Sequence, residues 1–168
     1  SIEVRLYAED PDRDFLPATG SLRHLRFPQE SEYVRVDSGV REGDVISVHY
    51  DPMIAKLIVW DHDRDAAIRR MLQALSETEI VGVTTNVDFL YSVVAHPGFR
   101  QGKVDTGFID RHLSELTTSL NADSDQVLGL ASLFLLVQRK RVAASQAKAS
   151  ADPWSPWQRG DGWRMNDD

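Results

Sequence analysis

The sequence predicts an α+β fold in which antiparallel strands pack against helices. Residues 1–60 carry several short strand patterns separated by turn signals, and the hydrophobic period then changes from two residues to that of a helix. A third observation is a polar, low-hydrophobicity break that follows Leu120. We therefore expect one α+β domain over residues 1–120. Residues 121–168 would form the truncated start of a second, β-rich domain that opens with a helix.

The strand patterns begin at the first residues, where Ile2, Val4 and Leu6 alternate with polar side chains, as in a strand with one buried face. Residues 53–60 are apolar on both faces except at Lys56, which is typical of a central strand. Residues 15–20 predict an ordered loop with a turn at its glycine. The other strand patterns have turn residues at their ends and cover residues 22–27, 33–36, 45–50 and 80–83.

Four helices are expected between or after these strands. Asp63 or Asp65 can cap the first, whose apolar stripe consists of Ala67, Ile68, Met71, Leu72 and Leu75. The second follows Thr85-Asn86, which we interpret as its cap, and ends at His96-Pro97-Gly98. A third follows Asp105 or Thr106, with Phe108, Ile109, Leu113 and Leu116 on its apolar side, and a fourth covers about residues 125–144.

Composition excludes several classes of function. The 168-residue chain has no cysteine, which rules out disulfides and thiolate nucleophiles, and its net charge of −7 argues against binding nucleic acid or anionic membranes. The apolar run 127–137 is too short to span a bilayer. The five histidines lack a spacing such as His-x-x-x-His, so no metal site is expected. Both ends interrupt patterned segments, so we expect a piece of a longer protein.

Four segments carry a family signature in a fixed order: 2–11 (IEVRLYAEDP), 15–20 (FLPATG), 50–58 (YDPMIAKLI) and 82–90 (GVTTNVDFL). Together they resemble the C-terminal domain of the biotin carboxylase component of biotin-dependent carboxylases, over about residues 1–118. The resemblance implies an enzyme, a ligase that uses MgATP and bicarbonate to carboxylate biotin. It also implies an α-subunit dimer, a biotin carrier domain and a carboxyltransferase β subunit that receives the carboxyl group.

Much of the machinery that the resemblance implies is absent from this sequence. It contains no glycine-rich phosphate loop and no Met-Lys-Met biotinylation motif. The cofactors implied are biotin, ATP and Mg²⁺, with ATP and Mg²⁺ bound mainly by an upstream lobe. Alone, this piece is expected to be inactive. The resemblance and the lack of a leader pattern imply the bacterial cytoplasm as its compartment.

Two motifs near the C-terminal end narrow the family resemblance to one kind of carboxylase. Residues 152–157 (DPWSPW) and 161–166 (DGWRMN) resemble the start of the linker domain of bacterial methylcrotonyl-CoA carboxylase α subunits, enzymes of leucine breakdown. That domain contacts the β subunit, which makes Trp154, Trp157 and Trp163 candidate β-subunit contacts. Geranyl-CoA carboxylase or another acyl-CoA carboxylase stays open, because the family selects its acyl-CoA on the β subunit.

Arg5 is the main catalytic candidate. It matches the family arginine that faces biotin and stabilises the oxyanion formed when the ureido nitrogen loses its proton, a task suited to a permanently charged guanidinium. The alternative is an ordinary strand arginine paired with Glu3. Glu3 and Asp51 could orient Arg5, although both also suit structural roles, Asp51 as a turn residue before Pro52.

Tyr33 and Arg35 lie where the family's dimer interface runs, and both residue types are common interface anchors. The simpler interpretation is that they are exposed strand residues. This keeps a second hypothesis open, in which the piece is a non-catalytic scaffold for subunit assembly that acts through Tyr33, Arg35 and the tryptophan-rich tail.

Overall fold

The computed structural model of the chain describes residues 1–47, 49–117 and 124–149, with side chains of the last segment described over 128–140. The chain divides into two compact units, Ser1–Leu120 and Asn121–Asp168. In the second unit the described element is one helix, α5 (Ser124–Ala149). It begins and ends near the limits predicted for the fourth helix and is five residues longer at its end. The three tryptophans of the tail lie outside the described residues.

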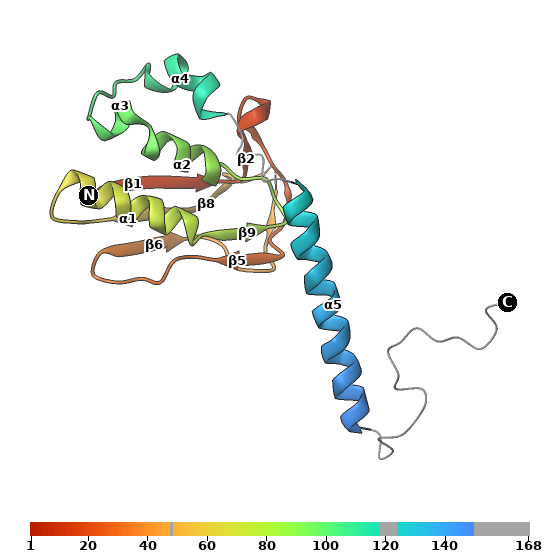
Figure 1. The fold of residues 1–168 in the computed structure, drawn as a ribbon. Coiled ribbons are helices and arrows are strands. Elements are labelled where there is room, and N and C mark those ends of the chain that lie inside the picture. The colour runs from red at the N-terminus through yellow and green to blue at the C-terminus, as the bar shows by residue number, and fades with distance from the viewer. Residues whose placement is uncertain (48, 118–123, 150–168) are drawn as a thin grey trace. The chain divides into compact units, whose positions relative to one another are not determined.

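The first unit mixes strands and helices, as the sequence predicts, and most of its strands are short (Figure 1). The strands are β1 (Ile2–Tyr7), β2 (Glu9–Asp10), β3 (Leu16–Pro17), β4 (Gly20–Ser21), β5 (His24–Arg26), β6 (Val34–Ser38), β7 (Val45–Ile46), β8 (Met53–Val59) and β9 (Glu79–Val81). The helices are the 3₁₀ turn η1 (Pro11–Arg13), α1 (Arg64–Ser76), α2 (Val87–Ala95), α3 (Pro97–Arg100) and α4 (Phe108–Leu116).

The main sheet has three antiparallel strands in the order β1-β8-β6. Strand β8 is therefore central, as its apolar pattern predicts. Its register places Val4 of β1 and Val36 of β6 on either side of Leu57. Directly opposed residues of antiparallel strands point to the same face, so one face of the sheet collects the apolar side chains.

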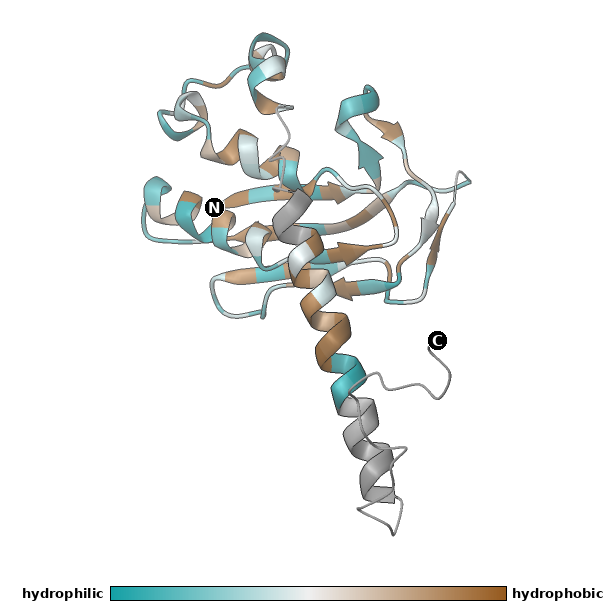
Figure 2. Ribbon diagram, turned by 45° about the vertical axis from the view of Figure 1, so that its right-hand side comes forward, coloured by the Kyte–Doolittle hydropathy of each residue, from teal (hydrophilic) through white to brown (hydrophobic). Residues whose placement is uncertain are grey.

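That apolar face forms the core together with α1. Leu6, Leu57 and Val59 of the sheet and Ile68 and Met71 of α1 are fully buried. The hydropathy colouring shows the apolar stripes of these strands and of α1 (Figure 2). Asp63 begins α1, with its carboxylate accepting a hydrogen bond from the Ala66 amide at 2.7 Å, one of the two caps predicted. The predicted stripe is correct except that Ala74 is buried in place of Leu72, which is only partly covered.

Three local predictions need correction. The predicted loop 15–20 contains β3 and the start of β4, which pair with β2 and β7. Asp14 and Phe15 adopt left-handed backbone conformations that turn the chain back to make this pairing. In α4, Phe108 and Leu116 are buried, but Ile109 and Leu113 are 41% and 39% exposed. The stripe fails there because one short helix covers the unit's edge with only part of its surface.

The third correction concerns Asn86. It occupies the N-cap position of α2, but its side chain makes no capping hydrogen bond. The amide instead reaches back to the backbone of β1, as described below. Among the residues that the structure describes, no helix is both long enough and apolar enough to cross a membrane.

Candidate functional site

The candidate site is the outer face of the β1-β8-β6 sheet, the face opposite the core. Its side chains lie in two cross-strand rows, which the register defines. One row is Arg5, Lys56 and Asp37, and the other is Glu3, Ile58 and Arg35. Neighbours within such a row have Cβ atoms about 5 Å apart. The sheet therefore places Arg5, the catalytic candidate, and Arg35, the interface candidate, on the same surface at opposite edge strands.

Arg5 presents an accessible cation at this surface. Its side chain is 61% exposed, and its Nε lies 3.7 Å from Oε1 of Glu3, which is itself 46% exposed. An exposed ion pair at that distance is weak and leaves guanidinium N–H groups available to another acceptor. Glu3 is thus close enough to orient Arg5, as one of the two sequence interpretations requires.

Asp51 has a different local role. Its carboxylate accepts a hydrogen bond from the Met53 amide at 3.0 Å, which shapes the turn that enters β8. Burial, followed by the charge of Asp51, raises the pKa of the Glu9 carboxyl. The turn role of Asp51 is therefore present in the structure, while its predicted role in orienting Arg5 stays a prediction.

Asp37 joins the other two cations of the outer face. It pairs with Arg35 at 2.8 Å and with Lys56 at 3.3 Å. These contacts, led by the hydrogen bond from Arg35, hold the pKa of the Asp37 carboxyl below its ordinary value. Lys56 therefore has the partner that a lysine in an apolar strand requires, and Arg5 differs from it in pairing only loosely.

Asn86 fixes the backbone that carries Arg5. Its carbonyl Oδ1 accepts a hydrogen bond from the Tyr7 amide at 2.9 Å, and its Nδ2 donates to the Arg5 carbonyl at 3.2 Å. The bonds bracket the β-bulge between Leu6 and Tyr7, where the ladder to β8 is interrupted. Asn86 is 6% exposed, and it is the one polar side chain in the buried class within the described ranges. Strand β1 lies at the edge of the sheet, and Asn86 gives two of its backbone groups a hydrogen-bond partner.

An aromatic cluster lies where β8 ends and β6 begins. The rings of Tyr33 and Trp60 are stacked with centroids 5.6 Å apart, and His62 meets both edge-on. The Arg70 guanidinium lies over the Tyr33 ring at 4.6 Å and also binds the Asp61 carboxylate. Backbone and Arg70 hydrogen bonds lower the pKa of Asp61. Tyr33 is thus held rigidly beside Trp60, which is 47% exposed, and such rigid aromatics suit a contact surface.

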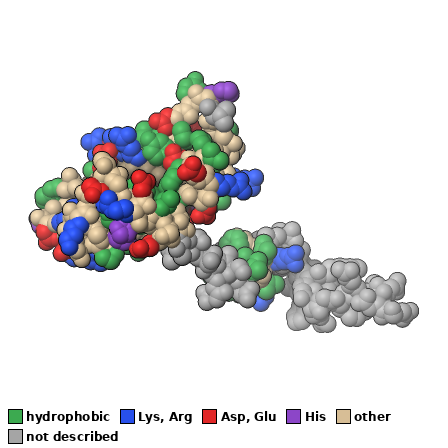
Figure 3. Space-filling view, turned by 90° about the horizontal axis from the view of Figure 1, so that it is seen from above, with side chains coloured by type: hydrophobic (Ala, Val, Ile, Leu, Met, Phe, Trp, Pro, Cys, Tyr) green, Lys and Arg blue, Asp and Glu red, His purple; other side chains and the backbone are tan. Residues whose placement is uncertain are grey.

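Charge on the first unit is mixed in sign. The face shown in Figure 3 displays acidic and basic side chains interspersed with apolar ones. One basic group is tied to acids on the β5–β9 pair, where His24 lies 3.2 Å from Glu42 and 2.8 Å from Glu79, and Arg26 also pairs with Glu79. His24 and Arg26 thus belong to an ion-pair network with Glu42 and Glu79.

Sequence reasoning missed one group of chemically capable residues. His96, His112 and Glu115 come together in the structure with ligand atoms that all lie within 4.8 Å of one another. The separation of His112 and Glu115 by three residues on one helix is a usable signal, because i and i+3 side chains share a face. The search for a His-x-x-x-His pattern does not detect it.

Comparisons with known proteins place the chain in a family. The family model described as "Biotin carboxylase C-terminal domain" matches residues 3–111. The mitochondrial methylcrotonoyl-CoA carboxylase subunit alpha of Dictyostelium discoideum is 48% identical over 166 residues, which is 99% of this chain and 23% of that protein. The mouse protein of the same name is 40% identical over the same shares. The chain therefore spans about a quarter of these relatives.

A solved structure supports the fold of the first unit. The biotin carboxylase domain dimer of the 2-oxoglutarate carboxylase from Hydrogenobacter thermophilus, in complex with MgADP and bicarbonate, matches with a TM-score of 0.66 and 34% identity. That match covers 70% of this chain and 26% of the other. The likeness to this structure supports the antiparallel sheet and packed helices described for the first unit.

Proposed function

The chain belongs to the biotin carboxylase C-terminal domain family, and on that premise we propose that it is a segment of the biotin carboxylase subunit of an acyl-CoA carboxylase. The acyl-CoA proposed is 3-methylcrotonyl-CoA, as in the relatives that match 99% of the chain. The corresponding piece of a geranyl-CoA or other acyl-CoA carboxylase is the alternative. The observation that carries the proposal is the accessible Arg5 on the outer face of the sheet.

The role we propose for Arg5 is to hold negative charge on the ureido oxygen of biotin. Biotin, when bound, supplies the nitrogen that carries the carboxyl group. Arg5 fits this partner because its guanidinium is 61% exposed and its contact with Glu3 is 3.7 Å long, which leaves donors for a stronger acceptor. Asn86 holds the backbone of the strand that carries Arg5, and Glu3 lies beside the guanidinium. A positioned cation stabilises the charge that develops on an oxyanion.

ATP and Mg²⁺ belong to the proposed whole subunit. The sequence has no glycine-rich phosphate loop, and the proposal is that an upstream lobe binds both for the most part. The proposed subunit also brings in an α-subunit dimer, a biotin carrier domain and a carboxyltransferase β subunit. The solved relative named above is a dimer with MgADP and bicarbonate, which supports the dimer and the cofactors by similarity.

The test is Arg5→Ala in the intact subunit, measured as biotin-dependent ATP cleavage. Loss of one oxyanion donor lowers the rate about 10²–10³-fold. Arg13→Ala is the matched control, because Arg13 is also an exposed arginine, with its Nε 3.6 Å from an Asp10 oxygen. We expect the control to keep wild-type activity. Unchanged turnover in Arg5→Ala, with a control that is also unchanged, would remove the catalytic role.

A second candidate function is subunit assembly, and helix α5 favours it. Seven apolar side chains of this helix are exposed: Leu128, Leu130, Leu133, Phe134, Leu135, Leu136 and Val137. Successive helical residues point about 100° apart, so this run makes the helix apolar all round, a property of helices covered by other protein. We propose that residues 121–168 begin the linker domain and contact the β subunit, through Trp154, Trp157 and Trp163 among others.

This proposal has its own test. A subunit that lacks residues 121–168 should fail to capture the β subunit in pull-down while it keeps the fold of the first unit by circular dichroism. Arg35→Glu tests the dimer proposal separately, because it reverses a charge on the outer face. Light scattering should then report a smaller mass, and an unchanged mass would count against Arg35 as an interface residue.

The compartment also stays a proposal. The two relatives named above are mitochondrial proteins of eukaryotes, whereas the motifs of the tail resemble bacterial subunits. The bacterial cytoplasm remains our prediction for this chain, and the source of the gene would decide it.

A further inference from the structure

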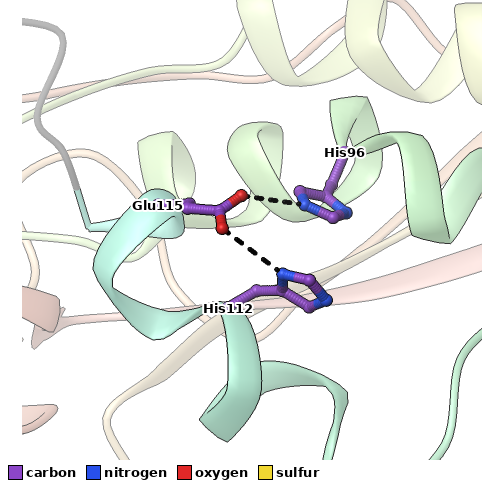
Figure 4. Close-up of side chains that lie close together, drawn as sticks. All are labelled: His96, His112 and Glu115. Carbon is purple, nitrogen blue, oxygen red and sulfur yellow. Dashed lines mark hydrogen bonds and ion pairs between the residues drawn. The ribbon is translucent and has the colours of Figure 1, made fainter.

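A cluster of His96, His112 and Glu115 joins two helices at the edge of the first unit, away from the outer face of the sheet (Figure 4). His96 is the N-cap of α3, while His112 and Glu115 lie one turn apart on α4. Figure 4 shows the Glu115 carboxylate beside both imidazole rings, with one oxygen directed toward each. Its Oε2 is 3.4 Å from Nε2 of His96, and its Oε1 is 3.7 Å from Nδ1 of His112.

The spacing of these atoms suits a small divalent ion. Imidazole nitrogen and carboxylate oxygen bind Zn²⁺ at about 2.0–2.2 Å, which puts neighbouring ligands of a tetrahedral ion roughly 3.4 Å apart. The three ligand atoms here lie within 4.8 Å of one another. Glu115 is 65% exposed, so its carboxylate can move toward both rings with little resistance from packing. Two histidines and one glutamate also form a known type of zinc ligand set that leaves a fourth position open.

An unpartnered nitrogen provides an independent observation. Within the described part of the chain, Nδ1 of His112 is the buried side-chain nitrogen or oxygen that lacks a hydrogen-bond partner. Its nearest acidic atom, on Glu115, is 3.7 Å away, beyond hydrogen-bond reach. A buried polar atom without a partner is unfavourable, and its presence calls for an explanation such as a bound ion. The His96 ring also packs against two other rings. Its centroid lies 5.2 Å from that of Phe108 and 4.4 Å from that of His112.

The hydrogen bond of His96 to its own helix opposes metal binding. Nδ1 of His96 accepts from the Gly98 amide at 3.1 Å, which puts the proton of a neutral ring on Nε2, facing Glu115. Coordination through Nε2 requires that proton to leave and Nδ1 to carry one, so the bond from Gly98 is lost. Loss of an N-cap changes an equilibrium constant about fivefold, a modest penalty for a three-ligand site. Because binding breaks this hydrogen bond, the Gly98 amide resonance should shift when the ion binds.

We propose that His96, His112 and Glu115 bind Zn²⁺ or a similar first-row divalent ion. Nε2 of His96, Nδ1 of His112 and the Glu115 carboxylate are the ligands, and water or a partner group takes the fourth position. His96 precedes α3, and the other two ligands lie on α4. The bound ion therefore links α4 to the rest of the first unit. Imidazole nitrogen ligands favour such ions over Mg²⁺, which prefers oxygen.

The experiment titrates the full 168-residue chain with Zn²⁺ and follows heat by calorimetry and the Gly98 amide by NMR. We expect one saturable equivalent, a shift of the Gly98 resonance, and no competition from Mg²⁺. Glu115→Gln and His112→Gln should each weaken the affinity at least ~10-fold. Glu115→Gln changes an exposed side chain, so it decides the matter even if His112→Gln does not fold.

His24→Gln is the matched control, because His24 also lies between two glutamates but on the β5–β9 pair. It should bind Zn²⁺ as the wild type does. Absence of saturable binding, wild-type affinity in Glu115→Gln, or loss of binding in His24→Gln would each overturn the proposal. None of these outcomes depends on carboxylase activity, so the metal site and the proposed function fail independently.

Discussion

The two units of the chain differ in whether their large apolar side chains are buried. The first unit buries the large side chains of β8 and α1, with Leu57, Ile68 and Met71 fully enclosed. Helix α5 of the second unit leaves residues of the same type exposed, including Leu133 at 58% and Phe134 at 61%. The solved relative covers 70% of the chain, whereas two methylcrotonoyl-CoA carboxylase alpha subunits cover 99%. Within the described residues, the first unit therefore encloses a core of its own, whereas the apolar side chains of α5 stay uncovered.

The sharpest test of this comparison replaces a leucine in each unit. Leu57→Ala removes a fully buried side chain from the centre of β8 and should lower the free energy of unfolding by about 2–5 kcal/mol. Leu133→Ala removes an exposed one and should change it by less than about 0.5 kcal/mol. Urea unfolding of the 168-residue chain measures both. Equal costs would show that α5 packs against a core already present in this chain.

Replacing one glycine by alanine in each unit should change stability by a smaller amount, and in opposite directions in the two units. Gly82 has φ of +118°, and an added Cβ would lie 1.9 Å from the Ser21 carbonyl oxygen. Gly82→Ala should therefore destabilise the first unit by about 1–3 kcal/mol. Gly129 lies within α5 with nothing within 4 Å of its would-be Cβ. Gly129→Ala should favour the helix by about 1 kcal/mol, measured as increased helical circular dichroism. A destabilising Gly129→Ala would reveal a close neighbour of α5.

The smallest effect concerns pH and is confined to the first unit. The hydrogen bond to Glu79 is the main cause of a raised pKa at His24, whose ordinary value is 6.5. A raised folded-state pKa contributes stability that is complete below 6.5 and is lost as pH rises through the folded-state value. His24→Gln should remove this dependence, so that its melting temperature approaches that of the wild type at alkaline pH. A constant difference across pH would show that the ion pairs of His24 contribute nothing.

The sequence predicts the periodic parts of the fold and misses the contacts between distant segments. Strand β1, central strand β8, helix α1 and the Asp63 cap follow from hydrophobic period and capping chemistry, and the structure confirms them. Asn86 was interpreted as a helix cap because Asn before a helix usually is one. Its partners on β1 lie 79 and 81 residues away, so no local pattern can reveal them.

The candidate site divides in the same way. The family motif identifies Arg5, and strand alternation predicts that it points away from the core, as the structure shows. The cross-strand rows that unite Arg5 and Arg35 on one face depend on register, which the sequence pattern does not specify between strands so far apart. The His96, His112 and Glu115 cluster depends on how α3 and α4 pack, and only half of it has a spacing that could be recognised in advance.

The long-range bonds of Asn86 have a consequence for the order in which the chain acquires structure. Strand β1 is translated before both β8 and Asn86, so its pairing with β8 must wait for residue 59 and its hydrogen bonds to Asn86 for residue 86. Contacts of such sequence separation form late and slow folding. During that interval the apolar residues of β1 are open to mispairing or to capture by chaperones. Synthesis that pauses before residue 86 should therefore leave a nascent chain that is prone to aggregate.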